Sequence, residues 1–180
     1  MKTNALLITA SVWLLSACSS PQPQPPPEKQ APPEQVHGTL IQVMRGVLFP
    51  NSNIIFAVQS QSPTAIKSTT TDPSTATDPF QGPYNGWLAV ENSGIALAEA
   101  ANLLTLPGRK CSNGRDAPIN NPDWPMLVQG LRDAGMKVYQ AGQSKKEDSI
   151  PDAADAVATA CANCHDKYRD KPGGDAARCT

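Results

Sequence analysis

The sequence predicts an all-α protein that folds as an antiparallel four-helix bundle. After residue 37, apolar residues recur three and four positions apart in four segments, which is the spacing of one face of an α-helix. Proline and glycine separate these segments, and no βαβ pattern is visible. Four amphipathic helices bury their apolar faces by packing against one another, and this favours a bundle.

The first helix is predicted from Leu40 onward. Pro50 interrupts the segment, and because proline lacks an N–H and clashes with the preceding turn, we expect it to kink or split the helix near Phe49. Residues 62–86 are rich in Thr, Ser, Pro and Asp, which predicts a long, mobile loop. The apolar positions of the first helix are Leu40, Val43, Met44, Val47, Leu48, Ile54, Ile55 and Val58.

The second and third helices follow this loop. The second is predicted from about Trp87 to Leu106, where Pro107 and Gly108 stop it. The third is predicted to start with Asn121 as N-cap and Pro122 at its first position. The apolar seams are Trp87, Val90, Gly94, Leu97, Ala101 and Leu104, and then Trp124, Leu127, Val128, Leu131, Ala134 or Gly135, Val138 and Ala141.

The fourth helix is predicted to begin near Pro151 and to end before Pro172, and it carries a motif. Residues 160–166 read ACANCHD, which contains C-x-x-C-H, the attachment signature of c-type haem. Positions three apart share one helix face, so the thiols of Cys161 and Cys164 can both reach one flat macrocycle, with His165 as proximal iron ligand. We expect one covalent haem c, for which the small residues of the seams leave room.

Three other uses of these cysteines are compatible with a C-x-x-C pair. A zinc site usually takes two close pairs of ligands, and Cys111, Cys179 and His37 would complete one only from scattered positions. A thioredoxin-like C-x-x-C lies at a helix start beside a βαβ pattern, which is not visible here. A structural disulfide between Cys161 and Cys164 is the simplest alternative, but it leaves the adjacent histidine without a role.

The N-terminal residues predict export. Residues 1–17 have the form of a signal peptide, with an apolar stretch too short to anchor the chain across a bilayer. The sequence LSAC ending at Cys18 resembles the bacterial lipobox, whose cysteine becomes the lipidated first residue after cleavage. Ser19 resembles the outer-membrane sorting pattern, so we expect a protein anchored to the outer membrane through a lipid and facing the periplasm.

A tether and one domain are expected after Cys18. Residues 18–36 contain seven prolines between Pro21 and Pro33, a composition that favours extended conformations and forms no core. The bundle is expected over residues 37–171, with a C-terminal tail at 172–180. With 15 basic and 16 acidic residues and no basic run, the chain is not expected to bind nucleic acid.

From His37 to Arg169 the chain resembles the class II cytochromes c, the group that includes cytochrome c prime. The resemblance is carried by "CANCHDKYR", a haem pentad on the last helix followed by Tyr168 and Arg169. It implies a four-helix bundle with haem buried among the helices. Class I cytochromes place the pentad near the N-terminus with a Met ligand far downstream, whereas no Met follows His165 here. Pro50, the loop at 62–86 and the extra cysteines depart from the family pattern.

The resemblance also implies that the distal side of the haem faces the first helix. Low-spin members present a Met there, which makes Met44 the candidate distal ligand, although Met commonly serves as core filler. Met126 and Met136 on the third helix are weaker candidates. His37 lies about two turns from Met44, so both cannot ligate one iron.

Two further expectations concern Arg169 and the remaining pair of cysteines. Arg169 lies four residues after His165, and the resemblance implies that it flanks this histidine; a solvent-facing Arg at a helix C-terminus is the alternative. Cys111 and Cys179 are left over, and in an oxidising compartment we expect them to form a disulfide.

The function expected from these residues is electron transfer with redox partner proteins, by a cytochrome with His165 and Met44 as iron ligands. The alternative is a gas-binding or nitric-oxide-binding protein, similar to cytochrome c prime, with an open distal site. No catalytic set of residues is visible, so an enzyme is not expected. The sequence does not fix the oligomeric state, and a homodimer is one option.

Overall fold

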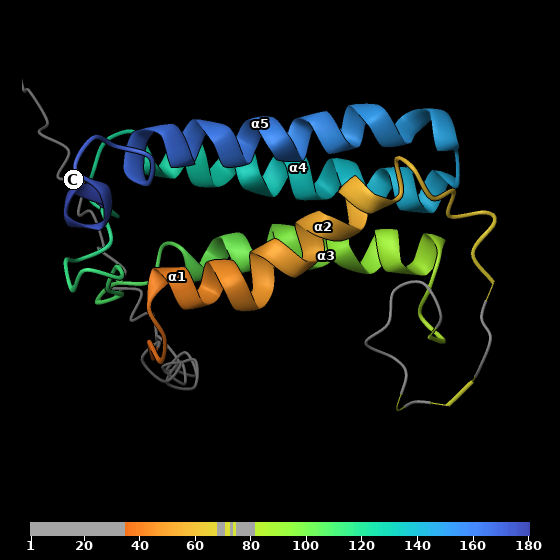
Figure 1. Ribbon diagram of the computed structural model, residues 1–180, viewed down its shortest axis with the longest axis horizontal. Helices are drawn as coiled ribbons and strands as arrows, with labels where there is room; N and C mark the ends of the chain where they lie inside the picture. Colours follow the sequence, from red (N-terminus) through yellow and green to blue (C-terminus); the bar gives the residue numbers. More distant parts are fainter. Residues whose placement is uncertain (1–34, 68–70, 73, 75–81) are drawn as a thin grey trace, which may run out of the picture. The chain divides into compact units, whose positions relative to one another are not determined.

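The computed structural model describes residues 35–67, 71–72, 74 and 82–180. The signal peptide, Cys18, the tether up to residue 34 and part of the loop at 62–86 therefore lie outside the described residues. The described part is all-helical, with an isolated β-bridge between Lys110 and Asp116 but no strand, which confirms the predicted all-α class there. Its long helical elements lie side by side (Figure 1). None of the described helices is long and apolar enough to cross a membrane.

The first helical element is continuous through three parts: α1 (Leu40–Val43), a π-helical turn η1 (Met44–Leu48) and α2 (Phe49–Ala57). Pro50 lies in the first turn of α2 and has no N–H to donate to the preceding turn. Just before Pro50 the hydrogen-bond pattern changes from the four-residue spacing of an α-helix to the five-residue spacing of a π-helix. There the N–H of Phe49 donates to the carbonyl of Met44, five residues back. The helix therefore does not split at Pro50, which was one of the two expected outcomes; a π-turn precedes the proline, and the chain is helical on both sides.

The remaining helices are α3 (Trp87–Leu103), α4 (Trp124–Ser144) and α5 (Ile150–Tyr168), the last preceded by a 3₁₀ turn at Glu147–Ser149. Buried residues on α3 and α4 follow the predicted seams closely. Helix α3 ends three residues earlier than predicted, because the residue before Pro107 is disfavoured in the helical conformation.

The predicted start of the third helix is wrong. Helix α4 begins at Trp124 with Asp123 as N-cap, and the proline in its first turn is Pro125 rather than Pro122. The side chain of Asn121 donates instead to the Tyr168 hydroxyl, 3.2 Å away. Its carbonyl accepts the N–H of Trp124 at 3.0 Å, which closes a turn before the helix. A contact with the last helix thus replaces the expected cap.

Small residues let α3 and α4 pack closely against each other and do not leave a space between them. A Cβ added at Gly94 would lie 2.8 Å from the Gly135 carbonyl oxygen, and one added at Gly135 would lie 2.6 Å from the Ala98 nitrogen. The expectation that small seam residues leave room for a cofactor is therefore wrong for this pair of helices. Glycine permits their close contact, and the open space lies elsewhere.

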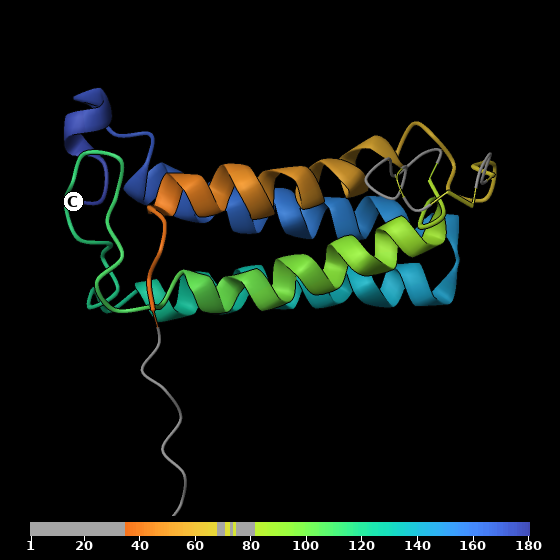
Figure 2. The same cartoon turned by 90° about the horizontal axis from the view of Figure 1, so that it is seen from below.

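One end of the helices is tied together by contacts between distant segments (Figures 1 and 2). The start of α1, the end of α3, the start of α4 and the end of α5 meet there. The N–H of Leu40 donates to the Lys110 carbonyl at 2.7 Å. Arg109 is only 4% exposed and donates to the carbonyls of Leu103 (2.7 Å) and Gly38 (2.6 Å). These bonds close the end of the molecule that holds the candidate site.

Candidate functional site

A cavity of about 410 Å³ lies between the first helical element, α4 and α5. The five cofactor-binding residues proposed from sequence all line it: Met44, Cys161, Cys164, His165 and Arg169. They come from two helical elements that are more than 100 positions apart in the chain. The volume falls within the range of roughly 300–1,000 Å³ that is typical of sites for organic ligands.

The walls of the cavity are mostly apolar. Trp124 is 1% exposed, and its ring packs edge-on against the Tyr168 ring with centroids 5.1 Å apart. The indole N–H donates to the Leu104 carbonyl at 3.1 Å, so this buried polar group is satisfied. Apolar side chains from three segments complete the lining: Leu40, Ile41, Leu48, Leu127, Val128 and Leu131. Such walls offer an apolar ligand a largely apolar surface to pack against.

Met44 is placed differently from the other distal candidates. It begins the π-turn and lines the cavity together with Leu40, Leu48 and Ser52, each four residues apart on one face. π-turns inside α-helices are frequent at functional sites. Met126 is 68% exposed and Met136 36% exposed, and neither lines the cavity.

His37, the remaining distal candidate, is exposed and precedes α1. It does not line the cavity either. Of the four candidates proposed from sequence, Met44 is therefore the one that the fold brings to the same space as His165.

The two thiols of the pentad are free and partly buried. Burial raises the pKa of the Cys161 thiol, and burial, with smaller contributions from Cys161 and Asp123, raises the pKa of Cys164 to about 11. Both are therefore protonated near pH 7. Redox-active cysteines are thiolates whose pKa is lowered by their surroundings, so this environment argues against the thioredoxin-like alternative. Within the described residues no group of three or more His, Cys, Asp and Glu side chains is arranged to hold a metal ion.

His165 lies next to the thiols on α5 and is half-buried. Burial, and secondly the Arg169 guanidinium, lower the pKa of its imidazole, so the ring is neutral near pH 7 and keeps a lone pair for a ligand. The Arg169 guanidinium makes a two-pronged pair with Asp170, with Nε–Oδ1 2.7 Å and Nη2–Oδ2 2.6 Å. The predicted flanking arginine is thus beside the cavity, but a carboxylate already holds it.

A polar network holds the last turn of α5, which directly follows the pentad. Tyr168 is 4% exposed, and its hydroxyl donates to Asp123 Oδ1 at 2.6 Å. Lys167 pairs with the other oxygen of this carboxylate at 2.5 Å. These hydrogen bonds, from Lys167 first and Tyr168 second, lower the pKa of Asp123. Helical periodicity gave no sign of this network, since it joins residues about 45 positions apart.

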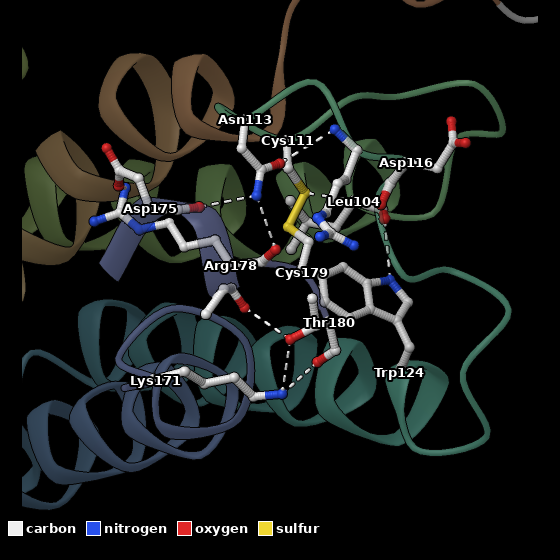
Figure 3. The surroundings of a disulfide bond; sticks show 12 residues. Leu104, Cys111, Asn113, Asp116, Trp124, Lys171, Asp175, Arg178, Cys179 and Thr180 are labelled. Atoms are coloured by element: carbon white, nitrogen blue, oxygen red, sulfur yellow. Dashed lines mark hydrogen bonds and ion pairs between the residues drawn. A yellow bond between two sulfur atoms is a disulfide. The ribbon is translucent and has the colours of Figure 1, made fainter. Parts of the chain in front are cut away.

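The structure joins Cys111 and Cys179 in a disulfide, with Cα atoms 6.6 Å apart, as predicted (Figure 3). The N–H of Cys179 donates to the Tyr168 carbonyl at 2.9 Å. The amide of Asn113 donates to the carbonyls of Asp175 (2.9 Å) and Arg178 (3.1 Å). Residues 172–180 are therefore bound to the end of the helices and contribute Arg178 and Cys179 to the cavity wall. Sequence reasoning missed Arg178 and Arg45, which both line the cavity.

Comparisons with family models, with curated proteins and with solved structures find no match for this chain. The function is therefore argued from its own residues and from the cavity that they form.

Proposed function

We propose that the chain is a c-type cytochrome of the class II kind, an antiparallel four-helix bundle that binds one haem c and carries electrons. Cys161 and Cys164 would hold the haem, His165 would be the proximal iron ligand and Met44 the distal one. The observation that carries the proposal is that a C-x-x-C-H motif and a methionine from a distant helix line the same apolar cavity. The expected antiparallel arrangement agrees with the helix ends that meet around that cavity.

The residues present fit this group in their chemistry. The two cysteines are free rather than joined in a disulfide, and attachment needs this reduced form. Each thiol would add its sulfur to one carbon of a vinyl group and its hydrogen to the other, so two thioether bonds would form without any oxidant. A disulfide between these cysteines would leave the adjacent imidazole and the apolar cavity unexplained.

Haem bound in this cavity supplies an iron that takes up and releases one electron. The neutral imidazole of His165 offers its lone pair from α5. The thioether of Met44 favours the reduced state of iron, raises the potential and blocks access of small ligands. The apolar walls, Trp124 among them, would pack against the macrocycle. Phe49 lines the cavity and is 63% exposed, so the cavity reaches the surface where a redox partner can approach.

The lipid anchor on Cys18 completes the proposal. A tether of residues 18–36 would keep the domain at the outer membrane while allowing it to reach partners in the periplasm. The export that this requires is also what haem attachment of the c type requires.

Optical spectra of both redox states, combined with the substitution Met44→Ala, test the proposal. We expect the wild type to be low-spin and slow to bind carbon monoxide. Met44→Ala should be high-spin, should bind carbon monoxide readily and should have a lower potential, whereas the exposed Met126→Ala serves as control and should behave like the wild type. Truncating a fully buried Met costs about 2–5 kcal/mol, and Met44 is partly buried, so circular dichroism must first show that the variant is folded.

Two other outcomes have definite meanings. A wild type that is already high-spin and binds carbon monoxide readily would favour the gas-binding alternative, with Met44 as core filler. A Met44→Ala variant that stays low-spin would show that a different residue ligates the iron.

A further inference from the structure

We propose that Arg178, in the C-terminal tail, binds a carboxylate of the haem. This inference rests on the proposed function and deepens it, since it names a residue that recognises the polar edge of the cofactor. Arg178 lies outside the region that resembles the class II cytochromes, and it lines the cavity beside the disulfide.

Three arginines line the cavity, and they differ in what they already bind. Arg169 holds Asp170 through two hydrogen bonds, and Arg45 is exposed. Arg178 pairs with Asp175 through Nη1 alone, at 2.7 Å. Its Nε is covered and has no acceptor among the described residues. Buried N–H groups in proteins nearly always have a partner, so this donor points to a group that is still to be supplied.

The carboxylates of a haem are suitable acceptors for the unpartnered Nε–H of Arg178. The macrocycle is apolar except for its two carboxylates, which need hydrogen-bond donors or a cation when they lie against an apolar cavity. A guanidinium binds carboxylates in a planar, two-pronged fashion. Because Asp175 engages Nη1, the edge formed by Nε and Nη2 retains its donors for a second carboxylate. The Asp175 side chain is 73% exposed, so water rather than Arg178 supplies most of its solvation.

The backbone around Arg178 is held in place before any ligand binds (Figure 3). The Cys111–Cys179 disulfide fixes the next residue, and the amide of Asn113 donates to the Arg178 carbonyl at 3.1 Å. Chain ends are otherwise the most mobile parts of a domain. Restraining the tail beforehand reduces the ordering cost of binding, which is how preorganised contacts gain affinity.

A cation beside the haem has a measurable electrical effect. Reduction adds one negative charge to the haem, and a nearby guanidinium stabilises that charge by Coulomb attraction. Removing the cation therefore lowers the midpoint potential. We expect Arg178→Gln to shift the potential downward and Arg178→Lys, which keeps the charge but loses the planar fork, to shift it less. Arg115→Gln is the matched control, because Arg115 is exposed in the adjacent loop and does not line the cavity.

A double-mutant cycle tests whether the disulfide positions Arg178. Cys111→Ser with Cys179→Ser should release the tail and lower the potential, and adding Arg178→Gln should then change it little further. Fully additive shifts would show that the tail does not act through this arginine. Potentials are measured by optical redox titration of variants whose fold and attached haem are verified by circular dichroism and by mass.

The outcomes separate this inference from the proposed function. A wild type without covalent haem overturns the proposed function, and the role of Arg178 falls with it. A haem-bearing wild type whose potential shifts no more with Arg178→Gln than with Arg115→Gln leaves the cytochrome intact and overturns the role of Arg178 alone.

Discussion

The close contact between α3 and α4 gives a quantitative prediction from two glycines on the same helix. Gly135 faces α3, where an added Cβ would lie 2.6 Å from the Ala98 nitrogen and 2.8 Å from the Gly94 carbonyl oxygen. Ordinary van der Waals contact begins at 3.4 Å, and both neighbours are backbone atoms that cannot rotate away. Gly130 lies on the exposed side of α4 and would meet nothing within 4 Å.

The magnitude follows from two opposing effects. Replacing glycine by alanine inside a helix stabilises it by about 1 kcal/mol through propensity alone, and this applies to both positions. Gly135→Ala additionally forces the helices apart, and overpacking of this kind typically costs about 1–3 kcal/mol. Subtracting one variant from the other removes the propensity contribution. The steric cost of about 1–3 kcal/mol then remains as the difference in unfolding free energy.

Thermal unfolding followed by circular dichroism measures this difference. For a chain of this size, 1 kcal/mol corresponds to roughly 3 °C in Tm, so Gly130→Ala should melt about 3–9 °C above Gly135→Ala. Gly130→Ala should also melt above the wild type. Equal melting temperatures for the two variants would refute the close approach of α3 and α4, and with it the conclusion that the space for a cofactor lies elsewhere.

Three further predictions concern the Cys111–Cys179 disulfide, Asp123 and Cys18. Replacing both Cys111 and Cys179 by serine should cost about 4 kcal/mol in urea unfolding under oxidising conditions, because the bond closes a loop with a sequence separation of 68; an unchanged midpoint would contradict the bridge. The pKa of Asp123 is lowered in the folded state, so the stability that its carboxylate contributes is full above about pH 4 and is lost as the pH falls through the lowered pKa. The stability difference between wild type and Asp123→Asn should therefore shrink on acidification, and a difference that grows would reverse the sign of the argument. A fatty-acid analogue should label the wild type but not Cys18→Ser, and equal labelling would remove the lipid anchor.

Much of the fold could be predicted from helical spacing, because the buried residues of α3 and of α4 recur three and four positions apart within one unbroken segment each. Val90, Leu97, Val128 and Val138 are all at most 3% exposed and all lie in the predicted seams. The start of α4 could not be predicted in this way. Asn121 and Asp123 are both residue types that favour the N-cap, and in the structure the side chains of both bond the Tyr168 hydroxyl, which folding brings near from the end of α5.

The residues that line the cavity could be predicted only where they carry local patterns. The pentad is a contiguous motif, and Met44 stands on a recognisable helix face. Pro50 signalled an interruption, but sequence alone does not say whether a helix kinks, splits or widens into a π-turn. Arg178 could not be recognised, because the tail has no periodicity and its position depends on a disulfide to a residue 68 positions away.

The most direct test of the central claim is the mass of the denatured protein after expression in a host that matures c-type cytochromes. The proposal predicts a polypeptide mass increased by one haem, and loss of that increment when Cys161 and Cys164 are both replaced by alanine. Replacing Cys111 and Cys179 instead should leave the haem attached, because their sulfurs belong to the separate disulfide. A wild-type mass equal to that of the bare polypeptide, with both pentad thiols still free, would contradict the proposal.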